Sequence, residues 1–172
     1  VREEELLICS RSIGTADISS AIPRIAYALE RLTPVGDPYR LKRMPDAPRD
    51  AVKIAFQQLL RGKYTLASRL ASQARSEMPN EYTAKAVFDE IITENAEIKE
   101  YLGALKPWGG RLLWHESEII IDATLRAYER GLTVLPLHDA LLAPDDQIDD
   151  AAAVLEEAFV NRFGVAPEIT LE

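Results

Sequence analysis

The chain has 172 residues, a net charge of −8 at pH 7 and a single cysteine, Cys9. This length can bury one substantial core, so we expect one domain, 1–172, with at most a protruding subdomain. One cysteine excludes an internal disulfide framework and a cysteine-rich zinc site, which favours a reducing, cytoplasmic setting. No stretch reaches the roughly 18 apolar residues of a membrane helix, and no signal peptide is visible, so we expect no membrane association. The chain starts with Val1 rather than Met, which favours a fragment or a processed product of a longer protein.

The apolar spacing and the turn residues predict short strands at both ends of the chain and helices between them. The expected strands cover 4–9, 12–18, 132–137, 140–144 and 167–172. The expected helices cover 20–32, 47–62, 65–76, 80–102, 111–130 and 146–163. Ser19 or Ser20 and Asn80 are expected as N-caps, while Gly62, Gly131 and Gly164 are expected to end helices. This order predicts an α+β fold: a small antiparallel sheet formed by both ends of the chain, with an inserted helical block at about 40–105.

The acidic net charge hides a basic segment. Residues 40–75 contain nine basic and two acidic side chains, a net charge of +7, whereas the remainder has 11 basic and 26 acidic side chains, a net charge of −15. A basic segment on an acidic body indicates an element that faces phosphates. A solvated helix face would give the same pattern, and the sequence leaves both interpretations open.

Two carboxylates stand at the ends of expected strands. Asp139 follows His138 between two apolar runs, in LTVLPLHDALLAPD, and Asp17 ends a strand 122 residues earlier. A plain turn would explain Asp139, because Asp is common in turns. Two acids that meet at the edge of one sheet would instead suit Mg²⁺, which prefers oxygen ligands and leaves room for water and substrate phosphates. A pair of such ions supports phosphoryl transfer.

Three segments resemble, in order, the motifs of the family A DNA polymerases. DISSAIPRIAYAL is similar to motif A, D-Y-S-Q-I-E-L-R, through Asp17, Ser19 and Arg24. RDAVKIAFQQLLRG is similar to motif B, R-x3-K-x7-Y-G, and LPLHDALL resembles motif C, V-H-D-E. The matching positions are Arg49, Lys53 and Gly62 in motif B and His138 and Asp139 in motif C. The single-subunit phage-type RNA polymerases share this plan and fit the same segments, so they remain an alternative.

The resemblance implies template-directed nucleotidyl transfer by a palm and reduced fingers. Asp17 and Asp139, with the backbone carbonyl of Ile18, would bind Mg²⁺ or Mn²⁺. Arg49 and Lys53, one turn apart, would bind the triphosphate of a nucleotide. His138 is expected to position the primer end, and Arg24 either orients the primer and template site or forms a salt bridge with an acid. The implied partners are nucleic acid, nucleoside triphosphates and a domain or partner protein that supplies a thumb.

Several positions depart from these motifs. Ile22 replaces the Glu that screens the ribose hydroxyl, Gln57 and Arg61 replace aromatic residues of motif B, and Ala140 replaces the acid after the motif C aspartate. Only 86 residues separate Lys53 from Asp139, and no thumb precedes motif A in these 172 residues. These departures keep two other hypotheses open: a polymerase-derived domain without catalysis that binds nucleic acid or a replication partner, and an acidic interaction domain whose motif matches are chance.

For two other groups of residues, a functional role is compared with a structural one. His115 and Glu116 lack the second histidine of H-E-x-x-H, so a structural polar face is the preferred interpretation. Trp108 and Trp114 are expected in the core rather than stacked on bases. A metal phosphohydrolase of the His-Asp type is disfavoured because the chain has only two histidines.

Overall fold

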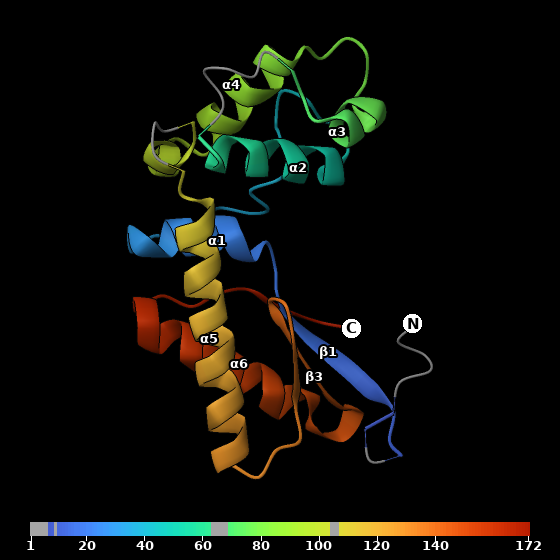
Figure 1. The fold of residues 1–172 in the computed structure, drawn as a ribbon, viewed down its shortest axis with the longest axis vertical. Helices are drawn as coiled ribbons and strands as arrows, with labels where there is room; N and C mark the ends of the chain where they lie inside the picture. Colours follow the sequence, from blue (N-terminus) through green and yellow to red (C-terminus); the bar gives the residue numbers. More distant parts are fainter. Residues whose placement is uncertain (1–6, 9, 63–68, 104–106) are drawn as a thin grey trace. The chain divides into compact units, whose positions relative to one another are not determined.

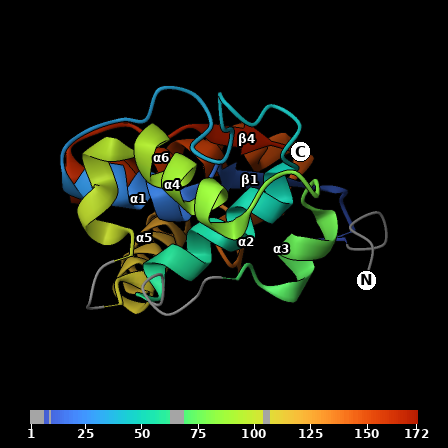
Figure 2. The same cartoon turned by 90° about the horizontal axis from the view of Figure 1, so that it is seen from above.

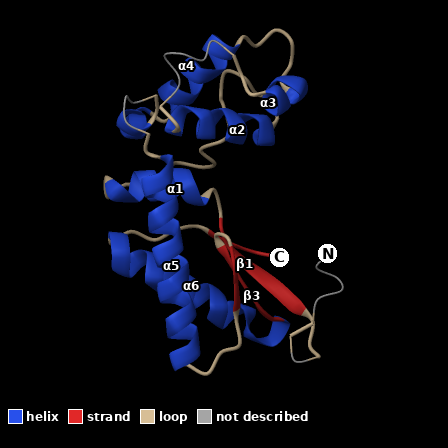
Figure 3. Ribbon diagram, in the orientation of Figure 1, coloured by secondary structure: helices blue, strands red, loops and turns tan. Residues whose placement is uncertain are grey.

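The structure is a computed structural model that describes residues 7–8, 10–62, 69–103 and 107–172. The chain divides into two compact units: unit 1 comprises Val1–Thr33 and Leu113–Glu172, and unit 2 comprises Pro34–Leu112. All four strands of the described chain belong to unit 1, whereas the regular elements of unit 2 are helical (Figure 3). The predicted α+β fold class is therefore confirmed.

The sheet of unit 1 joins both ends of the chain, as predicted. Its strands are β1 (Ile13–Ile18), β2 (Leu135–Leu137), β3 (Ala140–Pro144) and β4 (Ile169–Leu171). They follow the order β2-β3-β1-β4, and each neighbouring pair is antiparallel (Figure 1). The long β1 thus occupies an interior position, where two neighbours satisfy its backbone groups.

One face of the sheet packs on α6 (Ile148–Phe163). Along β1 every second residue is buried, and Ala16 and Ile18 have no exposed surface. Gly14 lies on the same face, where an added Cβ would come within 3.1 Å of an Ile148 side-chain carbon and of the Glu172 carbonyl oxygen. A glycine at this position therefore allows the helix and the last strand to approach β1.

Helix α1 (Ala21–Leu29) follows β1 almost at once. Ser20 occupies the N-cap position with a φ of +53°, but its side chain makes no capping hydrogen bond. The helix ends three residues before the predicted position because Arg31 adopts a φ of +58°, and the N–H of Leu32 donates to the carbonyl of Tyr27. A residue in the left-handed conformation, followed by an N–H that bonds to a carbonyl five residues earlier, commonly ends a helix.

Unit 2 packs around α2 (Arg49–Leu60), which contacts α3 (Ser72–Glu77) and α4 (Ala84–Glu94) (Figure 2). Its core contains five residues that have no exposed surface: Val52, Phe56, Leu59, Val87 and Ile91. The single helix predicted over 80–102 is wrong. Thr83 rather than Asn80 caps α4, accepting from the Ala86 N–H at 3.2 Å, and a 3-10 helix, η2 (Ala96–Tyr101), follows.

Other predicted boundaries need smaller corrections. The predicted helix 65–76 starts outside the described residues, and its described part is helical only from Ser72. The predicted strand 4–9 lies mostly outside the described residues, as does Cys9; Ile8 forms an isolated bridge with Arg11. Helix α5 (Gly109–Glu129) begins two residues earlier than predicted, and the 3-10 turn η3 (Asp145–Gln147) precedes α6.

None of the described helices combines the length and the apolar composition that a membrane-spanning segment needs.

Candidate functional site

Asp17 lies near the end of β1, and Asp139 lies in the turn directly before β3, the neighbouring strand, at the same end of the sheet. Asp17 pairs with Ala140 of β3, and the N–H of the next residue, Ile18, donates to the carbonyl of Asp139 at 3.3 Å. The two aspartates are thus one residue out of register across one antiparallel ladder. Since adjacent strands are about 4.8 Å apart and a residue advances about 3.4 Å, their Cα atoms are about 6 Å apart.

The hairpin between β2 and β3 presents Asp139 at its tip. Leu137 pairs with Ala140, which leaves only His138 and Asp139 in the turn. His138 has a φ of +54° and is exposed, while Asp139 is half-buried. Tight two-residue hairpins favour a positive φ at a central position, so the turn interpretation is correct as geometry. The same geometry brings Asp139 beside β1.

Asp17 faces away from α6. Side chains alternate along a strand, and Ala16 and Ile18 already occupy the face that α6 covers. Asp17 is half-buried, and its neighbours across the sheet are Ala140 on β3 and Thr170 on β4. Ala140 is only 5% exposed, so the acid that motif C would place there is replaced by a buried methyl group directly opposite Asp17.

Two carboxylates are donors of the kind that a divalent cation takes together with water or phosphates. Within the described ranges no group of three or more His, Cys, Asp and Glu residues is arranged to hold a metal ion. A complete protein cage is therefore not formed by these residues. Mg²⁺ is commonly bound through one or two carboxylates together with substrate phosphates, which is the kind of site that two neighbouring aspartates can make.

Arg24 is buried and fixes the corner at which β1 ends. Its guanidinium forms an ion pair with Glu168, and its Nε donates to the carbonyl of Ser19 at 2.5 Å. The N–H of Ser19 in turn donates to the carbonyl of Glu168 at 3.0 Å. With 4% of its side chain exposed, Arg24 has the salt bridge that was one of its two expected roles. Its role toward primer and template stays a prediction.

Arg49 and Lys53 belong to unit 2, on the first turns of α2. The Nε of Arg49 donates to Asp37 Oδ2 at 2.7 Å, and its guanidinium carbon lies 5.1 Å from the centroid of the Tyr39 ring. Asp37 Oδ1 also accepts from the backbone N–H of Tyr39 at 3.0 Å. Lys53 is exposed one turn later. The loop before α2 therefore holds Arg49 in one place beside an exposed lysine.

Three of the nine basic residues of the segment 40–75, Lys42, Arg43 and Arg49, form ion pairs with acids outside it. Lys42 pairs with Glu94 at 2.8 Å, and this hydrogen bond raises the pKa of Lys42. Arg43 pairs with Glu90 at 3.7 Å. Arg75 donates instead to the backbone carbonyls of the turn that follows α3. The excess of positive charge on unit 2 is thus smaller than the segment alone indicates.

Sequence reasoning missed Asp37 and Glu168, the acids that hold the two motif arginines. Asp37 lies in a Gly-Asp-Pro turn, which marks a loop but not a partner for Arg49. Glu168 directly follows Pro167 and lies four residues after Gly164, so the local sequence predicts a loop there. Their importance depends on contacts across 12 and 144 residues, which no local pattern reports.

In the segment 114–118, His115 is buried whereas Trp114 is exposed. His115 is 9% exposed, and its Nδ1 accepts from Arg162 Nε at 3.0 Å. That contact agrees with a structural role. Trp114 is 53% exposed, so the expectation that it packs in the core is wrong.

Comparison with solved structures relates this fold to a polymerase domain. The chain is similar to the POL domain of Pol1 from M. smegmatis in complex with a DNA primer-template and dNTP, with a TM-score of 0.55 and 16% sequence identity. The similarity covers 92% of this chain and 38% of that chain, so the chain spans well under half the length of this relative. No protein-family model matches the sequence, and no curated protein matches it. The chain thus has an α+β, palm-like fold with a helical block, similar to part of a polymerase domain.

Proposed function

We propose that this chain is the palm and reduced fingers of a polymerase of the family A type and performs template-directed nucleotidyl transfer. The observation that carries the proposal is that Asp17 on β1 and Asp139 in the turn before β3 lie beside each other at one end of the sheet. The two residues come from distant parts of the chain, and each lies in a segment that resembles a polymerase motif. A fold similar to a POL domain supports the same assignment.

In this proposal Asp17, Asp139 and the Ile18 carbonyl hold Mg²⁺ or Mn²⁺. The bound ions would stabilise the attacking and leaving oxygens of an in-line phosphoryl displacement. Arg49 offers a planar set of donors to a triphosphate, and Lys53 adds a mobile point charge beside it. His138, exposed on its turn, contacts the primer end, while Arg24 keeps the strand end that carries Asp17 in position.

The partners in this proposal are nucleic acid, nucleoside triphosphates and a domain or protein that supplies a thumb. Duplex affinity grows with the number of phosphates neutralised, and unit 1 contributes little to it. From the sequence, unit 1 has 7 basic and 18 acidic residues, whereas unit 2 has 13 basic and 10 acidic residues. Support from another domain is therefore part of the proposal. The cytoplasmic location stays a prediction.

A second candidate is a polymerase-derived domain that binds nucleic acid or a replication partner without catalysis. The observation that favours it is Ala140, which places a buried methyl group opposite Asp17 where motif C has an acid. The two candidates differ in whether Asp17 and Asp139 are needed for turnover or only for structure.

Primer extension decides between them. A labelled primer-template is incubated with Mg²⁺ or Mn²⁺ and either ribo- or deoxyribonucleotides, using the wild type, Asp17→Asn and Asp139→Asn. Asp149→Asn, an exposed acid in the first turn of α6, serves as the matched control. We expect extension by the wild type and the control and none by the other two variants. Equal extension by Asp139→Asn rules out the proposed site, and binding of the primer-template without extension by any protein favours the second candidate.

A further inference from the structure

Helix α5 exposes a stripe of large apolar side chains. Trp114, Ile121, Leu125 and Tyr128 have exposed fractions of 53%, 54%, 57% and 81%. Their spacing of seven, four and three residues places them along one side of the helix. Fourteen residues at about 1.5 Å each give the stripe a length of about 21 Å. A contiguous exposed apolar patch of this kind typically marks an interaction site.

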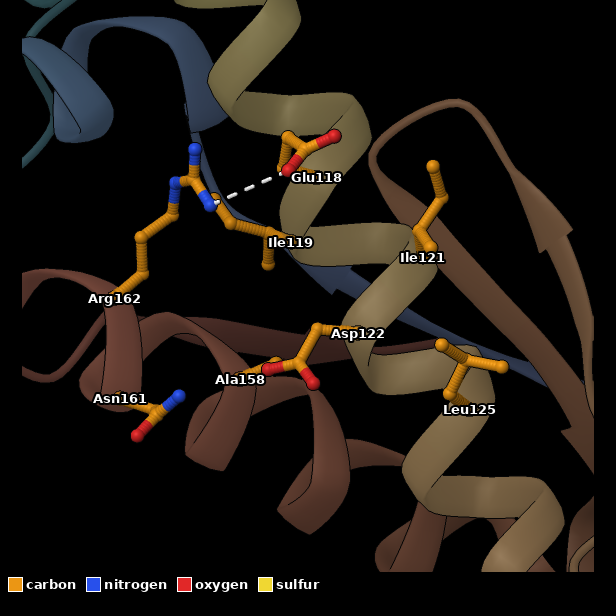
Figure 4. Close-up of a pocket in the computed structure, with 8 residues that line it drawn as sticks. All are labelled: Glu118, Ile119, Ile121, Asp122, Leu125, Ala158, Asn161 and Arg162. Carbon is orange, nitrogen blue, oxygen red and sulfur yellow. Dashed lines mark ion pairs between the residues drawn. The ribbon is translucent and has the colours of Figure 1, made fainter.

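A groove runs beside this stripe, between α5 and α6. Two cavities, of about 310 and about 460 Å³, share Asn161 as a wall. Figure 4 shows the first, with Ile121 and Leu125 on α5 and Asn161 and Arg162 on α6. Ile119 and Ala158, each 1% exposed, form its floor. The second cavity extends the groove along α6 past Val160.

Arg162 fixes one end of the groove. Its Nε donates to His115 at 3.0 Å, its guanidinium carbon lies 4.9 Å from the centroid of the Trp114 ring, and its Nη1 pairs with Glu118 at 3.8 Å (Figure 4). One arginine of α6 thus contacts three residues of α5, Trp114, His115 and Glu118. The groove is therefore preformed, and binding there would require little reordering of side chains.

The groove is acidic. The residues that line the two cavities include four acids and two arginines, and Arg130 follows the end of α5. All three basic residues, Arg126, Arg130 and Arg162, are already in ion pairs with acids of α5 or α6. Glu156 and Glu157 line the second cavity, and Glu118 and Asp122 line the first. An occupant must therefore offer apolar side chains together with positive charge.

This charge selects among the possible occupants. Pairing of α5 with α5 of a second copy would bring the same acidic face against itself, which is unfavourable at a symmetric interface. A nucleic acid would meet a surface with the wrong sign. We propose that the α5–α6 groove binds an amphipathic helix of a partner protein, about four turns long, with an apolar stripe flanked by Lys and Arg. This proposal does not depend on whether the chain is catalytically active.

The test uses a defined probe. A labelled 16-residue helical peptide carries Leu at i, i+4, i+7 and i+11 and Lys on both flanks; a second peptide has Glu in place of every Lys. Fluorescence anisotropy measures the binding of each peptide to the wild type, to Leu125→Ser and to Leu32→Ser. Leu32 is a matched control, because it is 42% exposed and lies outside the groove. Thermal unfolding confirms that each variant is folded.

We expect the Lys peptide to bind the wild type and Leu32→Ser with a Kd in the micromolar range, and Leu125→Ser to bind it about tenfold more weakly. The Glu peptide should bind at least about tenfold more weakly than the Lys peptide. The proposal is overturned if Leu125→Ser binds as well as the wild type, or if both peptides bind equally. It is also overturned if sedimentation shows a dimer that Leu125→Ser dissociates, or if duplex DNA binds in the groove and displaces the peptide.

Discussion

The neighbouring aspartates predict an unusual response of stability to Asp139→Asn. The substitution keeps the size of the side chain and removes one of two like charges, on residues whose Cα atoms are about 6 Å apart. At this distance two unit charges repel by about 0.7 kcal/mol in water and about 2.8 kcal/mol at an effective dielectric constant of 20. Both side chains are half-buried, and salt screens over about 8 Å, so we expect a gain of about 0.5 kcal/mol in the free energy of unfolding without metal.

A divalent cation reverses this order. A metal concentration tenfold above its Kd stabilises a folded protein by about 1.4 kcal/mol, provided that the unfolded chain does not bind it. The wild type should gain this amount, whereas Asp139→Asn should gain almost none. For a chain of this size the difference amounts to about 3–6 °C in Tm. The variant is therefore expected to be the more stable protein in chelator and the less stable protein in excess Mn²⁺.

Urea unfolding in EDTA and in Mn²⁺, followed by circular dichroism, measures both effects. Asp149→Asn is again the control, because it removes a carboxylate at a helix N-terminus without touching the sheet, and its metal response should match the wild type. A loss of stability by Asp139→Asn in EDTA would contradict this expectation, as would a gain in stability from Mn²⁺ equal to that of the wild type. Either result would mean that the two carboxylates do not share a site.

Two further predictions concern residues held by ion pairs. Asp37→Asn weakens the hydrogen bond that orients Arg49. The KM for nucleotide should therefore rise about threefold to tenfold, while the free energy of unfolding should change by less than about 1 kcal/mol. A KM equal to that of the wild type would show that Asp37 does not position Arg49. The hydrogen bond from Arg130 lowers the pKa of Glu157 below its ordinary value of 4.5. This pair therefore stabilises the fold above pH 4.5, and its contribution is lost as the pH falls through the lowered pKa. The Tm difference between wild type and Glu157→Gln, measured from pH 7 to pH 2.5, should accordingly shrink toward zero at the acidic end, and a difference that stays constant with pH would contradict the pairing.

The parts of the fold that could be predicted from sequence are those set by local patterns. Apolar runs bounded by turn residues located the strands at both ends of the chain, and the two-residue break at His138 and Asp139 located the hairpin. The helix expected over 80–102 failed because its break is tertiary in origin. Asn95 is 1% exposed, and its side chain donates to the carbonyls of Ile91 and Pro38. A side chain that caps one helix while bonding a loop 57 residues away gives no periodic signal.

The candidate site shows the same division. The motif residues were visible because their order and spacing could be compared with a pattern, and Asp17 on β1 does lie beside Asp139 in the turn before β3. The environment of each motif residue was not visible. Arg24 and Arg49 look alike in sequence, yet Arg24 is 4% exposed while Arg49 is 34% exposed. Only the partly exposed arginine can reach a phosphate without breaking a buried ion pair, which leaves Arg24 as a residue that positions the strand end.

The distribution of charge between the units bears on both proposals. Unit 1 has an excess of eleven acidic residues, 18 against 7, and unit 2 has an excess of three basic residues, 13 against 10. An acidic body suits carboxylates that need a cation, but it repels a nucleic-acid backbone except where metal or arginine intervenes. The same excess attracts basic protein segments, and the α5–α6 groove combines it with exposed apolar surface. A basic partner bound there would neutralise part of unit 1, so it would favour nucleic-acid binding by this chain as well as occupy the groove.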